Sequence, residues 1–137
     1  MNGLSDASAI VALLQLTGEV IKYLKDVKDA PKECQRCMDE ASGLYGLLIS
    51  LLHHLNQGNT GDPWYTAVRA LSVENGAFDQ YKWALEQLRS KVEMQDGIQK
   101  AKKRLLWRFN KEEVASILGR IERLKSLVSI ALEMDHL

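Results

Sequence analysis

The sequence predicts an all-α domain: a bundle of four long helices with one or two short connecting helices. Apolar residues recur at spacings of three and four over several long stretches, and no stretch alternates as a β-strand would. Residues that break helices separate these stretches, namely Pro31, Gly58, Gly61, Pro63, Gly76 and Gly97. The chain has 137 residues, 46% of them hydrophobic and 26% charged, which fits one domain with a compact core. Residues 1–137 are therefore read as one helical bundle.

The first expected helix is the most apolar part of the chain. It runs from Ser5, as its N-terminal cap, to about Val27, with Asp6 in its first turn. Its apolar residues cover more than one face, which predicts burial among several neighbours or entry into a membrane. They are Leu4, Ile10, Val11, Leu13, Leu14, Leu16, Val20, Ile21 and Leu24. Residues 7–18 carry no charge, and this run is shorter than the roughly 20 residues of a lone membrane-spanning helix. We therefore expect no permanent anchor.

The second expected helix has Pro31 in its first turn and runs to about Leu55. Its apolar residues have the spacing of a buried face: Cys34, Met38, Ala41, Leu44, Tyr45, Leu48, Leu51, Leu52 and Leu55. A loop over residues 57–62 follows. A short helix over residues 63–71 then places Trp64, Val68 and Leu71 on the core.

The C-terminal half is expected to hold two further long helices. Asn75 and Gly76 form a turn before a helix from about Phe78 to Glu93. Residues 98–107 have weaker periodicity and are expected to form a helix rich in lysine and arginine. Asn110 and Glu113 have the spacing of a capping box, in which each side chain accepts a hydrogen bond from the other residue's backbone N–H. The last long helix follows this box.

Composition and motifs disfavour several classes of function. The net charge of zero disfavours a nucleic-acid binder, which is usually strongly basic. Cys34 and Cys37 form a CxxC pair, but no further ligands at zinc spacing and no βαβ pattern accompany it, so we read both as small apolar core residues. No nucleotide-binding loop and no nucleophile–base motif is visible, so neither an enzyme nor a cofactor nor a bound metal is expected. Without a signal peptide, the expected location is cytoplasmic.

A cluster of basic residues near residue 100 is a candidate site for anionic lipid headgroups. Its members have no acidic residue among them: Lys100, Lys102, Lys103, Arg104, Arg108 and Lys111. Each basic residue near an anionic membrane surface contributes about 1 kcal/mol. The alternative is a solvated helix face, with Trp107 and Phe109 anchoring the segment to the core. The residues alone leave both open and favour the second.

Five segments, in the same order, resemble fungal HeLo-like domains, which occur at the N-termini of NLR-type STAND receptors and of cell-death executioners. These segments are GLSDASAIVALLQ, VIKYLKDVKDAPKECQR, PWYTAVRAL, NGAFDQYKWALEQL and LLWRFNKEEVASILGRIERLKSLVSIALEMDH. The chain departs from the family pattern at Arg108 and Ala77, where the family usually has proline. Both departures concern local turns and leave the bundle unaffected.

The resemblance implies a bundle similar to the executioner domain of mammalian necroptosis. It implies a domain that oligomerises and permeabilises the plasma membrane in programmed cell death, in fungal innate immunity or heterokaryon incompatibility. The first helix is then the inserting element, and the partners are anionic lipids, further copies of the domain and an upstream receptor or C-terminal trigger region. We expect the chain to be the N-terminal part of a longer protein. The alternative is a non-enzymatic adaptor that oligomerises and signals without entering a membrane.

Overall fold

The computed structural model describes residues 3–27, 29–57, 62–93 and 107–134. The protein is all-α within these ranges, with five packed helices and no strand, so the predicted fold class and helical bundle are confirmed at this level. The helices are α1 (Gly3–Lys25), α2 (Lys32–Gln57), α3 (Pro63–Leu71), α4 (Ala77–Glu93) and α5 (Lys111–Met134).

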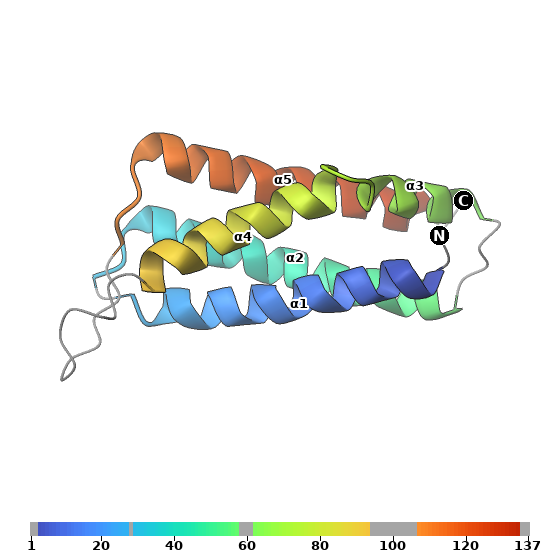
Figure 1. The fold of residues 1–137 in the computed structure, drawn as a ribbon, viewed down its shortest axis with the longest axis horizontal. Coiled ribbons are helices and arrows are strands. Elements are labelled where there is room, and N and C mark those ends of the chain that lie inside the picture. The colour runs from blue at the N-terminus through green and yellow to red at the C-terminus, as the bar shows by residue number, and fades with distance from the viewer. Residues whose placement is uncertain (1–2, 28, 58–61, 94–106, 135–137) are drawn as a thin grey trace.

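Four of the helices form an elongated bundle, and α3 lies at one end of it (Figure 1). α1 packs against both α2 and α4, and α5 packs against α2, α3 and α4. Along the bundle, α1 and α4 run in one direction while α2 and α5 run in the other (Figure 1). The start of α1 and the end of α5 therefore lie at the same end, beside α3.

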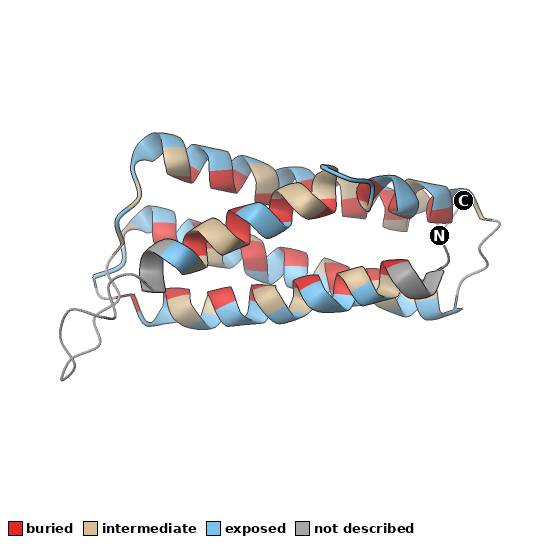
Figure 2. Cartoon of the chain, viewed as in Figure 1, coloured by how far each residue is buried: buried red, intermediate tan, exposed pale blue. Residues whose placement is uncertain are grey.

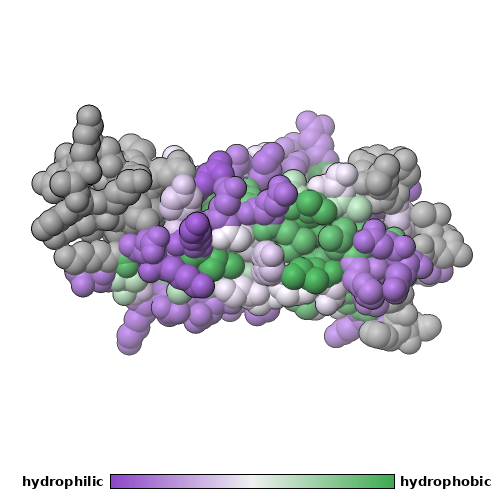
Figure 3. Space-filling model, turned by 90° about the horizontal axis from the view of Figure 1, so that it is seen from below, coloured by the Kyte–Doolittle hydropathy of each residue, from purple (hydrophilic) through white to green (hydrophobic). Residues whose placement is uncertain are grey.

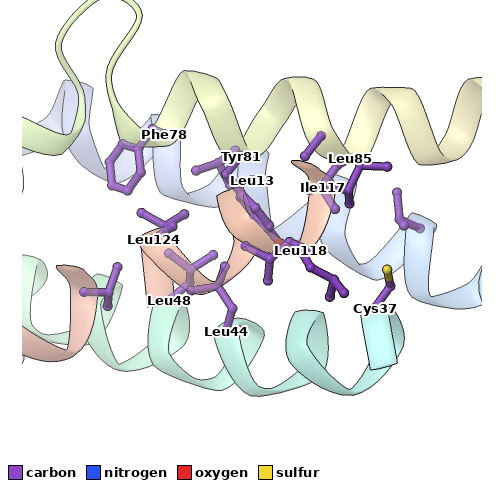
Figure 4. Packing of buried hydrophobic residues seen from close by; sticks show 14 of the residues in the cluster. Leu13, Cys37, Leu44, Leu48, Phe78, Tyr81, Leu85, Ile117, Leu118 and Leu124 are labelled. Carbon is purple, nitrogen blue, oxygen red and sulfur yellow. The ribbon is translucent and has the colours of Figure 1, made fainter. Parts of the chain in front are cut away.

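The core runs along the bundle axis, where each long helix contributes one buried stripe of mostly apolar residues (Figure 2). Side chains from α1, α2, α4 and α5 converge there, among them Leu13, Leu44, Leu48, Tyr81, Leu85, Ile117 and Leu124 (Figure 4). In α3, Trp64, Val68 and Leu71 are buried as the sequence predicted. A stripe of this kind arises because residues three and four apart share one face of an α-helix.

Two predicted local structures of the C-terminal half are present. Asn75 adopts a left-handed backbone with φ of 61°, and its N–H donates to Asp79 Oδ2 at 2.9 Å. Gly76 follows, and a Cβ there would lie 2.8 Å from the Val73 carbonyl oxygen, so only glycine fits without a shift. The capping box of α5 is formed reciprocally. Asn110 N donates to Glu113 Oε1 at 3.0 Å, and Glu113 N donates to Asn110 Oδ1 at 2.8 Å.

Several predicted details of the helices are wrong. α1 begins at Gly3, so Ser5 lies inside the helix and does not cap it. α2 begins at Lys32, and Pro31 precedes it, accepting hydrogen bonds at its carbonyl from Cys34 N and Gln35 N. Tyr45 is 36% exposed because it lies at the edge of the α2 stripe. The helix predicted over residues 98–107 lies outside the described residues apart from Trp107, which is not helical.

Candidate functional site

α1 is the candidate functional element, and one of its faces docks into the bundle. The residues of that face recur at spacings of three and four and are all buried: Asp6, Ile10, Leu13, Thr17, Val20 and Leu24. α2 and α4 are the two helices that flank it. Of the two alternatives that the sequence offered, burial among several neighbours or entry into a membrane, the bundle shows packing against two neighbours. The neighbours cover one stripe and leave the rest of the helix near solvent.

The outer side of α1 carries apolar residues among polar and charged ones. Val11 is 40% exposed, and Leu14, Leu16 and Ile21 are half-buried. Seen from the side of α1, the surface carries an apolar patch near its middle (Figure 3). The side chain of Leu4 lies outside the described residues. Of the predicted inserting residues with described side chains, four are core residues and four lie at the edge or on the outside.

α1 also meets a length and composition criterion for crossing a membrane. Among the described residues, the segment Asp6–Lys25 is the one that passes it. At 1.5 Å per residue, a helix of 20 residues spans about 30 Å, the thickness of a bilayer's hydrocarbon core. The window is 33% buried in the bundle, and a core helix of a soluble protein meets the same criterion. The criterion admits charged residues, whereas the expectation drawn from residues 7–18 counted the uncharged run alone, so that expectation stays a prediction.

A buried hydroxyl pair joins the middle of α1 to α4. Thr17 Oγ1 donates to the Leu13 carbonyl oxygen at 2.7 Å and lies 2.7 Å from the Tyr81 hydroxyl. Because the threonine hydroxyl has a single proton, Tyr81 is the donor in the second bond. Burial raises the pKa of Tyr81, so its hydroxyl stays protonated and keeps donating. This bond links α1 to α4 through two residues that are 64 positions apart in the chain.

A buried carboxylate joins the start of α1 to the end of α3. Asp6 is completely buried, and its Oδ1 accepts a hydrogen bond from Ser72 Oγ at 3.1 Å. Asp6 Oδ2 and the nearby Tyr65 hydroxyl both lack a hydrogen-bond partner among the described residues. Burial raises the pKa of Tyr65, and the Asp6 charge raises it further. A buried charge with one hydrogen bond is weakly compensated.

Two features mark the surface between α1 and α4. Arg89 Nη1 lies 2.9 Å from Glu19 Oε2 in an ion pair whose side chains are 34% and 57% exposed. Such exposed pairs contribute about 0–1 kcal/mol. A shallow groove of about 180 Å³ lies between the two helices and is lined mainly by apolar side chains. Its lining residues are Ala9, Ala12, Leu13, Leu16, Phe78, Asp79 and Lys82.

The structure describes only part of the predicted headgroup site. Lys100, Lys102, Lys103 and Arg104 lie outside the described residues, whereas Arg108 and Lys111 are exposed. The rings of Trp107 and Phe109 have centroids 4.7 Å apart, and both side chains pack against the core. These contacts fit the anchoring role that was the alternative to a lipid site. They leave the headgroup role of the six basic residues a prediction.

The cysteine pair behaves as core. Both thiols are free and completely buried, and Cys34 Sγ lies 3.8 Å from the Leu24 carbonyl oxygen of α1. Burial raises the pKa of Cys34 to about 11 and that of Cys37 to about 12. The nucleophilic thiolate is therefore scarce at neutral pH. Within the described part of the chain, no group of three or more His, Cys, Asp or Glu side chains is placed to hold a metal ion.

The polar contacts of α1 were not predicted from the sequence. Asp6 was predicted only as a charge of the first turn that the helix dipole favours, and Thr17 was not singled out. Both lie three or four residues from Ile10 or Leu13, and this spacing could have predicted that they are buried. Their partners, Ser72 and Tyr81, are 66 and 64 residues away, and no local pattern identifies them.

A search of protein-family models, curated proteins and solved structures finds no match to this chain. The resemblance to HeLo-like domains therefore rests on the five sequence segments, and the function rests on α1 and its contacts.

Proposed function

We propose that this domain is a membrane-permeabilising effector of programmed cell death that acts after oligomerisation, with α1 as the helix that leaves the bundle. At rest the domain is cytoplasmic, and on activation it meets anionic lipids of the plasma membrane. Its other partners are further copies of the domain and an upstream receptor or trigger region. In finer detail, the fold proposed is the HeLo-like arrangement of four long helices, with α3 as a short connection.

One observation carries this proposal. The helix that is long and apolar enough to cross a membrane also carries apolar side chains on and beside its outer face, with Val11 exposed and Leu14, Leu16 and Ile21 half-buried. A helix that serves only the core needs one apolar face, and polar residues on the other face keep it soluble. The exposed charged residues of α1 lie in its C-terminal third, namely Glu19, Lys22 and Lys25, whereas the exposed polar residues before them, Ser8 and Gln15, are uncharged.

Release of α1 requires a trigger. It would expose the buried side chains of Ile10, Leu13, Val20 and Leu24. At ~1.5–3 kcal/mol for each large apolar side chain, the four together cost about 6–12 kcal/mol in water. This is comparable with the whole stability of a typical domain, about 5–15 kcal/mol. The helix therefore stays docked unless a bilayer or other copies of α1 take up its apolar surface.

Dye release from anionic liposomes tests the proposal, using the domain fused to a trimeric coiled coil that forces oligomerisation. The informative variant is Val11→Lys, since Val11 is exposed and its replacement leaves the core intact. A lysine costs about 2.5–3.5 kcal/mol at the centre of a membrane helix and less toward its ends, and Val11 lies between the two, so we expect leakage to fall severalfold. A paired Leu13→Lys, Leu14→Lys change is less informative, because Leu13 is 4% exposed and its replacement unfolds the core.

Ile130→Lys is the matched control, because Ile130 is 51% exposed on α5. It adds the same charge to the surface without touching α1, and its leakage should equal that of the unmodified domain. Equal leakage from the Val11→Lys variant and the unmodified domain would refute insertion of α1.

The alternative function, a signalling adaptor that stays out of membranes, is favoured by an apolar strip on α2. Tyr45 and Ile49 are 36% and 47% exposed and lie one helical turn apart. A helix of a partner protein can dock on such a strip. This function predicts no leakage in any oligomeric state, and loss of partner binding on Ile49→Lys.

A further inference from the structure

The contact between Asp6 and Ser72 holds the start of α1 in an unusual way. The Asp6 carboxylate is completely buried, and within the described residues it accepts one hydrogen bond, from Ser72 Oγ at 3.1 Å. Its second oxygen, Oδ2, has no partner in hydrogen-bond geometry, although the Tyr65 hydroxyl lies close enough for Asp6 to raise its pKa. A buried carboxylate with so little compensation is sensitive to any further negative charge nearby. The start of α1 is therefore docked through a contact that one added charge can break.

Ser72 is placed where such a charge can be added. It follows the last residue of α3 and is half-buried, whereas Val73, Glu74 and Asn75 after it are exposed. Its Oγ also lies 2.9 Å from the Arg69 carbonyl oxygen, so its single proton is shared between two acceptors. The hydroxyl thus belongs both to a surface turn and to the buried contact with Asp6.

We propose that Ser72 is a phosphorylation site, and that its phosphorylation undocks the first turns of α1. The modifying enzyme would be an arginine-directed serine kinase, a class that selects an arginine three residues before the acceptor. Arg69 occupies that position and is exposed. In the reaction, Ser72 Oγ attacks the terminal phosphorus of a nucleoside triphosphate. The new O–P bond forms as the nucleoside diphosphate leaves, and the hydroxyl proton passes to a base of the kinase.

The phosphate breaks the contact with Asp6 by either of two routes. It carries a charge of about −1.5 to −2 at pH 7 and accepts hydrogen bonds where the serine hydroxyl donated one. If it stays beside Asp6, two negative groups repel each other in a poorly solvated place. If it turns outward to pair with Arg69, Ser72 no longer reaches Asp6. Both routes leave the Asp6 carboxylate without the hydrogen bond from Ser72.

The regulatory meaning of this site rests on the function proposed above, because undocking α1 matters only if the free helix acts. The undocking itself is independent of membranes. It is therefore measured in solution, as hydrogen exchange of backbone amides in residues 8–16 of α1. Amides in the middle of α5 serve as the internal reference for global stability.

Charge is separated from size by comparing Ser72→Glu with Ser72→Gln, which have nearly the same shape. We expect the glutamate variant to exchange at least about tenfold faster in α1 than the glutamine variant, with equal exchange in α5. Adding Asp6→Asn removes the repelled charge, so the Asp6→Asn, Ser72→Glu double variant should exchange like Asp6→Asn alone. Equal exchange in the glutamate and glutamine variants, or no rescue by Asp6→Asn, would overturn the mechanism.

The modification is tested on the unmodified chain with an arginine-directed serine kinase and Mg·ATP. We expect the mass of one phosphoryl group, mapped to Ser72 and absent from Ser72→Ala. Phosphate elsewhere only, or none, would overturn the assignment. The phosphorylated domain is then compared with the trimeric fusion in the dye-release assay. If phosphorylation accelerates α1 exchange while the trimeric fusion leaves liposomes intact, the regulatory contact stands and the membrane function fails. If liposomes leak while α1 exchange is unchanged by phosphorylation, the membrane function stands and the regulatory contact fails.

Discussion

The hydroxyl pair between Thr17 and Tyr81 allows the docking of α1 to be measured one group at a time. Thr17→Val removes the acceptor and leaves the completely buried Tyr81 hydroxyl without a partner. Tyr81→Phe removes the donor, but Thr17 Oγ1 keeps its bond to the Leu13 carbonyl oxygen. The two substitutions delete the same hydrogen bond, but one leaves an unpaired hydroxyl and the other does not. We therefore expect them to differ in effect.

The expected magnitudes follow from that difference. An unpaired buried hydroxyl costs ~1–3 kcal/mol, so Thr17→Val should lower the free energy of unfolding by this amount. Tyr81→Phe loses one hydrogen bond whose net contribution is about 0.5–1.5 kcal/mol. In the double variant the orphaned hydroxyl is absent, and two apolar groups meet in its place. Its loss should therefore be smaller than that of Thr17→Val alone.

Urea denaturation of the four proteins, followed by circular dichroism, gives the free energies of unfolding and the coupling energy between the two residues. We expect a coupling of about 1 kcal/mol or more, with the Thr17→Val variant the least stable of the four. Additive effects within about 0.3 kcal/mol would refute the reasoning, because they would show that the two hydroxyls do not interact.

Three further predictions concern local structure. Gly76→Ala should lower stability by about 1–3 kcal/mol, because the new Cβ meets a backbone oxygen at 2.8 Å. Gly46→Ala, in mid-helix with open space around it, should raise stability by about 0.5–1 kcal/mol. Thermal unfolding of the two variants checks both. Asn110→Ala removes the acceptor of the α5 capping box and should cost about 1 kcal/mol in urea denaturation. Burial raises the pKa values of Cys34 and Cys37 from 9.0 to about 11 and about 12, so the unfolded chain loses these protons first. Stability should therefore fall as pH rises above 9. Replacing both by alanine should make that slope shallower, and the fall that remains should come from Tyr65 and Tyr81, whose pKa values burial also raises.

The helical plan was predictable because its signals are local. Pro63 begins the short helix α3. Asn110 and Glu113, three residues apart, cap the long helix α5. The turn at Asn75 and Gly76 also follows from residues that tolerate its backbone and its tight packing. In each case the residues that determine the local structure are neighbours in the chain, so the structure can be predicted from a short stretch of sequence.

The parts that failed depend on distant neighbours. Whether Tyr45 is core or surface depends on how closely the helices beside α2 approach, which periodicity does not report. Asp6 is a charged residue that the usual rule places in solvent, yet Ser72 reaches it across the bundle. The apolar residues on the outer side of α1 were visible as composition, but whether another helix covers them is a property of the fold. The contacts that would control α1 were for this reason absent from the sequence-based prediction.

The polar residues of α1 fit a helix that moves from protein to lipid. Thr17 already donates its proton to its own helix, so leaving Tyr81 creates no unpaired donor on α1, and the orphaned hydroxyl remains behind on α4. Glu19 would lose Arg89, but Lys22 lies three residues on and shares its side of the helix, so the two can pair. Asp6 lies near the start of the helix, where an inserted segment meets the far headgroups. Under the proposed release, α1 would therefore carry no unpaired hydroxyl donor into lipid, and the Tyr81 hydroxyl would remain on α4, uncovered to water.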